Sequence, residues 1–188
     1  MKRIVMGCAL LLLVAVDRVL VAQGTSFGAA GVAATANGED LSSIETGLGG
    51  DLTLRAPGQR WTIGGGVQFM THAVSGSDDD LTNFALLVEP RYVLRERGDD
   101  AFGPYALARG TFIWSKIGAG DQSRRRTGKM LGFGLGTLYR FHGNIDLDLS
   151  VSWSLLWYGN EGFNGLIRKD SDAQGSSLGV RLGLLIGT

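Results

Sequence analysis

Two histidines and one close pair of aspartates are the residues of this 188-residue chain that could support acid–base chemistry. Asp146 and Asp148 lie two positions apart, so a strand would place both carboxylates on one face, where they could act as an acid–base pair. His72 and His142 are not followed two positions on by serine, so a histidine–serine pair on one strand face is missing. Because buried carboxylates need charged partners, we expect the two aspartates to pair with arginines. The sequence predicts no catalytic residue.

Two further segments resemble metal or nucleotide sites but lack the required spacing. Asp78-Asp79-Asp80 offers three carboxylates without the alternating ligands and the glycine of a calcium loop, so we expect a solvated acidic loop. The glycines of segment Gly132–Gly136 alternate with Phe and Leu, do not follow the G-x-G-x-x-G pattern and precede no helical period. The sequence therefore predicts no metal site and no cofactor-binding residue.

Arg124, Arg125, Arg126 and Lys129 form the densest cationic segment, which we expect to lie in a surface loop. One interpretation is a solvated loop, and the other is contact with lipid phosphates. The cations that would join them in the second case are Lys116, Arg168 and Lys169. The whole chain carries 18 basic and 18 acidic residues, and this balance does not favour a nucleic-acid partner.

The elements that must position these side chains are strands, because apolar and polar residues alternate after position 24. The clearest alternation runs through Asn144–Tyr158, and 30 glycines make long helices unfavourable. The expected strands are Ser26–Ala36, Ile44–Arg55, Trp61–His72, Asn83–Arg95, Tyr105–Lys116, Met130–Phe141, Asn144–Tyr158 and Leu178–Ile186. Pro90 lies inside a strand, where we expect a local bulge.

Short and long connections alternate between these strands. The short ones are Ala56–Gly58, Gly98–Ala101 and His142–Gly143, and the long ones are Asn37–Ser43, Ser75–Asp80, Gly118–Thr127 and Gly159–Gly175. An up-and-down meander would therefore gather all short turns at one end and all long loops at the other. Its polar face would carry Glu45, Asp51, Arg55, Glu89, Arg91, Arg95, Arg109, Arg140, Asp146, Asp148 and Arg181.

Three observations predict that the apolar face contacts lipid. The strands are longer than those of soluble proteins and long enough to cross a bilayer. Aromatic residues on the apolar face gather at two levels, as in outer-membrane barrels. The expected short-turn group is Trp61, Tyr92, Tyr139 and Phe141, and the long-loop group is Phe69, Phe84, Trp153 and Trp157. The polar face combines glycine with long charged side chains, which suits the narrow interior of an eight-stranded barrel.

The first residues have the pattern of a secretory signal peptide. Lys2 and Arg3 precede an apolar run from Met6 to Val16, which is too short to span a bilayer as a helix. Cleavage is expected after Ala22 or, alternatively, after Gly24. We therefore divide the chain into a signal peptide, residues 1–22, and one barrel domain, residues 23–188.

With these features, and with the strand segment Leu87-Val88-Glu89-Pro90-Arg91-Tyr92, the chain resembles the eight-stranded OmpA/OmpX-type, porin-like outer-membrane β-barrels of bacteria. The resemblance implies an all-β, antiparallel up-and-down transmembrane barrel in the outer membrane of a diderm bacterium. It implies periplasmic termini and recognition of the C-terminal strand by the barrel-assembly machinery. Arg181, Gly183 and Ile186 are similar to that signal, whereas Thr188 replaces the usual final aromatic residue.

The function expected of such a barrel is structural or surface interaction through the long loops, with a lumen plugged by ion pairs. Lipopolysaccharide phosphates are the expected partners of Arg124, Arg125, Arg126 and Lys129. The alternatives are an outer-membrane lipid-modifying enzyme and a soluble, secreted ligand-binding barrel. We expect no enzymatic activity, because the sequence offers no nucleophile–base pair.

Overall fold

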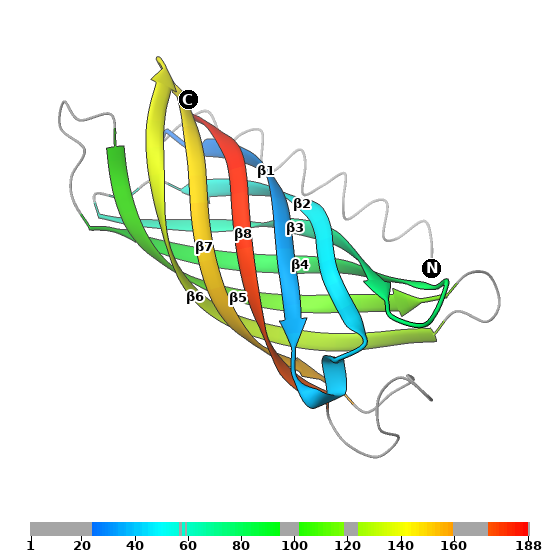
Figure 1. The fold of residues 1–188 in the computed structure, drawn as a ribbon. Helices are drawn as coiled ribbons and strands as arrows, with labels where there is room; N and C mark the ends of the chain where they lie inside the picture. The colour runs from blue at the N-terminus through cyan, green and yellow to red at the C-terminus, as the bar shows by residue number, and fades with distance from the viewer. Residues whose placement is uncertain are drawn as a thin grey trace, which may run out of the picture.

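The computed structural model describes residues 24–56, 58, 60–94, 102–118, 124–159 and 173–187. Eight strands form one closed barrel in the order β1 to β8 (Figure 1). Their bounds are β1 Ser26–Asn37, β2 Ile44–Ala56, β3 Trp61–Val74, β4 Asp80–Val93, β5 Phe102–Ile117, β6 Arg124–His142, β7 Ile145–Tyr158 and β8 Ala173–Gly187. A short 3-10 helix, η1, covers Glu39–Leu41 between β1 and β2. The predicted signal peptide lies outside the described residues.

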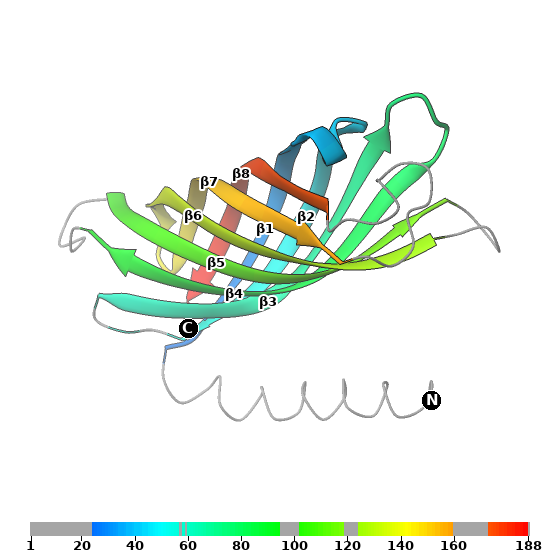
Figure 2. The same ribbon diagram turned by 90° about the horizontal axis from the view of Figure 1, so that it is seen from below.

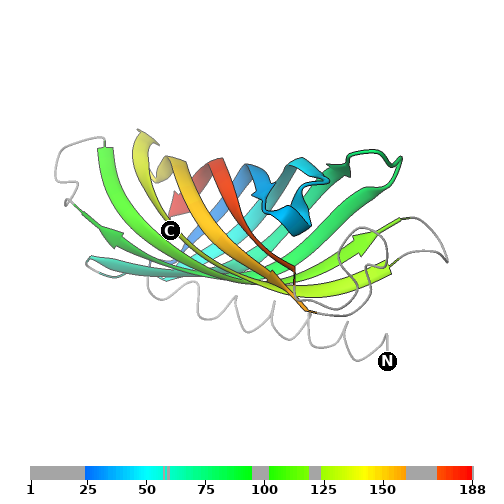
Figure 3. The same ribbon diagram turned by 60° about the horizontal axis from the view of Figure 1, so that its bottom comes forward.

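Every strand pairs antiparallel with its neighbour in sequence, and β1 pairs with β8 to close the barrel. Ser26 lies opposite Gly187, so the barrel begins and ends at the same rim, away from η1 (Figures 1 and 2). The strands are long and steeply tilted (Figure 3), from 12 residues in β1 to 19 in β6. Lengths in this range exceed those typical of soluble sheets. The part of the chain that the structure describes holds no helix long and apolar enough to cross a membrane.

Burial alternates along the strands with the polar face inside. In β4, Phe84, Leu86 and Val88 are exposed, whereas Glu89 is completely buried. The same exposed apolar face recurs in β7 and β8, and its members there are Leu147, Leu149, Val151, Trp153, Leu155, Trp157, Leu178, Val180, Leu182, Leu184 and Ile186. Exposure of such a continuous apolar surface to water is unfavourable, whereas its contact with the hydrocarbon of a bilayer is favourable. The predicted lipid-facing surface is confirmed.

Aromatic rings line both ends of this exterior. Trp61 lies opposite Tyr92 in the β3–β4 pairing, with 4.9 Å between ring centroids, near the short turns. Phe84 and Trp114 form the corresponding contact near the long loops, with centroids 5.9 Å apart. The two predicted levels are therefore present, and they mark the membrane interfaces.

One glycine shows why the interior needs small residues. A Cβ on Gly136 would lie 2.4 Å from the hydroxyl oxygen of Tyr105, which is buried in the lumen. β6 must therefore lack a side chain at this position for the tyrosine ring to fit inside an eight-stranded wall.

Three expectations about the strands and their connections are wrong. β6 begins at Arg124, so the cationic segment expected in a loop belongs to a strand. β4 ends at Val93 and β5 begins at Phe102, so the connection expected to be short, 94–101, is longer than the 75–79 loop. Pro90 lies opposite Ile63 with no register shift in either ladder of β4, because this extended position accommodates proline without a bulge.

Two residues expected in the lumen lie elsewhere. A register shift between Ile44 and Gly47 turns Glu45 to the exposed surface, where it accepts a hydrogen bond from Ser75. Arg140 is exposed at the short-turn rim, beside a second register shift at the end of β6. Arg95 lies outside the described residues.

Candidate functional site

The interior of the barrel gathers the charged residues into one network, and Glu89 on β4 is its centre. The Glu89 carboxylate is completely buried. One oxygen accepts hydrogen bonds from Arg55 at 2.7 Å and from Arg91 at 2.8 Å. The other accepts a hydrogen bond from Arg109 Nε at 2.7 Å. Arg109 thus lies on the polar face, as the sequence predicts.

Asp148 on β7 continues the network across the lumen. It accepts hydrogen bonds from Arg91 at 2.8 Å and from the Tyr105 hydroxyl at 2.5 Å. Arg181 on β8 donates to both Asp148 and Asp51, the latter at 2.9 Å. Four arginines and three carboxylates from β2, β4, β5, β7 and β8 are joined in this way (the ionic network: Asp51, Arg55, Glu89, Arg91, Arg109, Asp148 and Arg181).

The two aspartates considered for acid–base chemistry are not equivalent. Asp148 is fully buried and held by Arg91, Arg181 and Tyr105, whereas Asp146 lies at the rim, 3.7 Å from Arg140. The expected pairing with arginine is confirmed. An acid–base pair would need both carboxylates at one substrate, and this arrangement does not provide it.

The half of the lumen nearer the long loops holds a cluster of apolar side chains, with the buried polar residues His72, Asn83, Ser115 and Arg126 beside it. This apolar cluster consists of Leu41, Val74, Leu81, Ala85, Ile113, Ile117, Leu156 and Tyr158. Leu41 comes from η1 and is completely buried in the mouth of the barrel. The expectation of an ion-pair plug therefore describes one half of the lumen. Adjacent apolar pairs such as Leu155-Leu156 were a sequence signal for the other half, because one member of such a pair must face inward.

Of the four cations expected in a loop, the three whose side chains the structure describes are divided between the two faces of β6. Arg126 is buried, donates a hydrogen bond to the Gly159 carbonyl and lies 5.9 Å from the centroid of the Tyr158 ring. Arg125 and Lys129 are exposed on the outer wall. The side chain of Arg124, like Arg168 and Lys169, lies outside what the structure describes.

Lys116, Arg125 and Lys129 form the cationic patch on the outer wall of β5 and β6. Lys116 lies directly opposite Arg125, and Lys129 lies opposite both Phe112 and Trp157. All three cations are exposed, and within the described chain none forms an ion pair.

The cationic patch borders a cluster of aromatic rings. Phe112 and Trp114 are in contact, with centroids 4.6 Å apart, and Trp114 also contacts Phe84. Cations beside exposed aromatic rings at the end of a lipid-facing wall are well placed for lipid headgroups.

The remaining candidates for chemistry are separated from one another. His72 is buried, and its Nδ1 lies 3.0 Å from the Glu45 carbonyl oxygen. His142 is exposed at the end of β6. Asp78 and Asp79, between β3 and β4, and Asp80, the first residue of β4, are exposed as well. Across the described ranges, three or more His, Cys, Asp or Glu residues nowhere gather as metal ligands would.

Comparison with known proteins identifies the fold. The chain matches no protein-family model and no curated protein sequence. Among solved structures it is similar to Neisserial surface protein A, with a TM-score of 0.65, 14% identity, and coverage of 86% of this chain and 96% of that one. The N-terminal β-barrel domain of Pseudomonas aeruginosa OprF gives a TM-score of 0.53 at 14% identity, covering 88% and 100%. The attachment invasion locus protein of Yersinia pestis gives 0.51 at 17% identity, covering 88% and 97%.

These neighbours are eight-stranded outer-membrane barrels. The predicted fold class, an antiparallel up-and-down barrel of the OmpA/OmpX type, is confirmed. The apolar exterior and the charged interior are those of a protein in an outer membrane, which is the predicted location. Which rim faces the periplasm remains a prediction.

Proposed function

We propose that this eight-stranded outer-membrane barrel is a non-conducting scaffold that acts at the cell surface through its long loops and its outer wall. The observation that carries the proposal is the double closure of the lumen. The ionic network crosses one half, and the apolar cluster fills the other. A rigid wall without a water-filled pore is suited to presenting loops rather than to transporting solutes.

Recording from planar bilayers tests the closed lumen. The purified full chain is expected to give no steady single-channel current at neutral pH. The matched control is the same preparation heated until its fast-migrating folded band disappears from a gel, which measures the background of unfolded protein. Large, steady currents that require the folded band would overturn the proposal.

The cationic patch is the surface that we propose binds phosphate groups of outer-leaflet lipid, such as those of lipopolysaccharide. Phosphate is attracted to exposed Lys and Arg, and the neighbouring aromatic rings anchor the wall at the interface. The sequence prediction named Arg124, Arg125, Arg126 and Lys129. The burial of Arg126 removes it from that set, whereas Lys116, already named as a cation that would join them, is exposed directly opposite Arg125.

A triple variant, Lys116→Gln, Arg125→Gln and Lys129→Gln, tests the cationic patch. We expect it to weaken binding of purified lipopolysaccharide to the detergent-solubilised barrel and to flatten the salt dependence of that binding. Arg140→Gln is the control, because Arg140 is also exposed but lies at the opposite rim. Equal binding by the triple variant and the wild type would end this part of the proposal.

We propose no catalytic role for the barrel. His72, the only histidine that the structure describes in the lumen, is followed two positions on by Val74, so its own strand face carries no serine beside it. Incubation with labelled lipid A is expected to leave the lipid unchanged. Release of an acyl chain by the folded protein would support the lipid-modifying alternative instead.

A further inference from the structure

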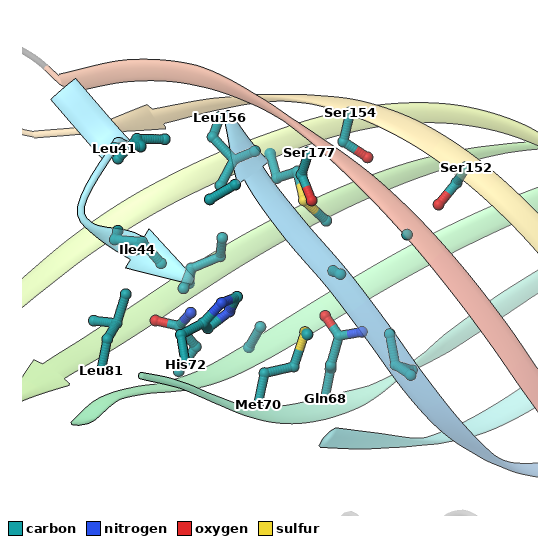
Figure 4. Close-up of a pocket in the computed structure, with 18 of the residues that line it drawn as sticks. Leu41, Ile44, Gln68, Met70, His72, Leu81, Ser152, Ser154, Leu156 and Ser177 are labelled. Carbon is teal, nitrogen blue, oxygen red and sulfur yellow. The ribbon is translucent and has the colours of Figure 1, made fainter. Parts of the chain in front are cut away.

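A cavity of about 60 Å³ lies inside the barrel, between the ionic network and the apolar cluster (Figure 4). Its lining changes character along the barrel axis. Leu41, Ile44 and Leu81 lie at the end near η1, and Gln68 and Ser152 lie toward the middle of the barrel. A mainly apolar end, which also holds His72, and a polar end in one cavity are the features of a site for an amphipathic molecule.

The polar end of the cavity has hydrogen-bonding groups without protein partners. The side chains of Gln68, Ser154 and Ser177 are all more than nine-tenths buried. Within the described chain, no group forms a hydrogen bond with any of them. Native interiors satisfy most buried polar groups, so three unpartnered ones around one cavity point to an occupant that donates and accepts hydrogen bonds.

The charge of that occupant follows from the same lining. Arg109 also borders the cavity, but its guanidinium is held by Glu89. The other polar groups of the lining are the amides of Gln68 and Asn83, serine hydroxyls and the His72 imidazole, whose Nδ1 faces the Glu45 carbonyl oxygen, and none of them carries a fixed charge. A charged ligand group placed among these side chains, next to the apolar end of the cavity, would lose its hydration without gaining a counter-ion. The cavity therefore favours an uncharged ligand.

Leu41 occupies the position where the tail of such a ligand would lie. Its side chain is buried above the cavity and packs against Gly175, where an added Cβ would approach Leu41 Cδ1 to 2.3 Å. None of the hydrogen bonds of its loop belongs to a strand ladder: Leu41 N donates to the Gly38 carbonyl oxygen, the Ser42 hydroxyl donates to the Glu39 carbonyl oxygen, and Ser75 N of the β3–β4 loop donates to the Ser43 carbonyl oxygen. Leu41 can therefore leave the mouth of the barrel without breaking a strand ladder.

We infer that the cavity is the head-group pocket of a binding site for an uncharged amphiphile with a hydroxyl or amide head, and that Leu41 fills the tail position until the ligand displaces it. A cavity of about 150 Å³ accepts benzene, so about 60 Å³ is room for roughly two or three heavy atoms while Leu41 is in place. Longer tails need the volume that Leu41 occupies.

Methionine methyl groups report on this cavity directly. Both Met70 and Met130 line it, so ¹³C-labelled methionine gives two signals there, assigned through Met70→Leu and Met130→Leu. The probes are the linear alcohols from ethanol to 1-hexanol, titrated into the folded full chain in deuterated micelles. We expect saturable shifts of both signals.

Variants at the two ends of the cavity separate head from tail. Gln68→Leu is expected to weaken alcohol binding about tenfold, because the hydroxyl loses a hydrogen-bond partner. Ser177→Ala is the second variant if Gln68→Leu gives no folded band, with a smaller loss expected. Leu41→Ala is expected to strengthen binding by about fourfold for each additional buried CH₂ of the alcohol.

Thr111→Val is the matched control, because Thr111 is a buried, unpartnered lumen hydroxyl outside the cavity lining. It should leave the titration unchanged. Shifts that rise linearly without saturation and equally in all variants would show partition into the micelle only and would overturn the inference. A Leu41→Ala variant with no gain for longer alcohols would also overturn it.

Discussion

The two halves of the lumen close the barrel by different physical means. In the half near the short turns, the ionic network holds buried charges in a fixed set of hydrogen bonds. In the half near the long loops, the apolar cluster excludes water by packing. A network of buried charges depends on every member, whereas an apolar core loses only the contacts of the removed atoms. Substitutions in the two halves should therefore differ in size and in their response to salt.

The largest loss of stability is expected from Glu89→Ala. This change leaves Arg55, Arg91 and Arg109 without their shared carboxylate in a lumen that already carries more guanidinium than carboxylate. Removing one partner of a buried pair costs about 3–5 kcal/mol. Urea unfolding in lipid vesicles, followed by tryptophan fluorescence, measures the loss. A variant as stable as the wild type would show that the ionic network does not hold the barrel together.

Leu156→Ala should cost somewhat less, about 2–4 kcal/mol, because it leaves a cavity in the apolar cluster but no unpaired charge. Its loss should not depend on salt, whereas anions of the added salt that enter from the short-turn rim are expected to pair with the freed cations and so reduce part of the loss in Glu89→Ala. The same unfolding experiment at low and high salt compares them. Equal salt dependence in both variants would remove the distinction between the halves.

Gly136→Ala tests the steric fit between the wall and the ionic network. The new Cβ would meet the Tyr105 ring, whose hydroxyl donates to Asp148. Overpacking of this kind costs about 1–3 kcal/mol. Gly110→Ala is the control, because nothing lies within 4 Å of its added Cβ. If the two variants unfold at the same urea concentration, the close approach of Tyr105 to β6 has no energetic consequence.

The smallest effect is expected from Arg140→Ala, which removes the exposed partner of the ion pair with Asp146 at the rim. The Arg140 side chain is 55% exposed, so the pair is largely screened by water. Exposed ion pairs contribute about 0–1 kcal/mol. A loss as large as that of Glu89→Ala would mean that an ion pair at the rim contributes as much to the free energy of unfolding as the ionic network does. That result would contradict the distinction between buried and exposed charges.

The sequence predicted which strand residues face outward or inward better than it predicted which side chains contact one another in the lumen. Alternation alone placed Phe84, Leu86 and Val88 outside and Glu89 inside, because a strand has a period of two. It could not predict that Arg181 reaches both Asp51 and Asp148, since this depends on how the strands are staggered around the closed barrel.

The ends of the strands were also hard to predict. Arg125 and Arg126 are both charged, so alternation is lost at the start of β6 although one side chain faces out and the other faces in. The entry of Leu41 into the mouth of the barrel depends on the path of a loop, and residue types do not specify that path.

The central claim is that the lumen is closed twice, and single-channel recording from planar bilayers tests it most directly. The recording compares the wild type with Glu89→Ala, Leu156→Ala and the variant that combines both changes. Because the two closures lie in series, we predict no steady current from the wild type or from either single variant that folds. Only the combined variant is expected to conduct. A steady current from the folded wild-type protein would contradict the account.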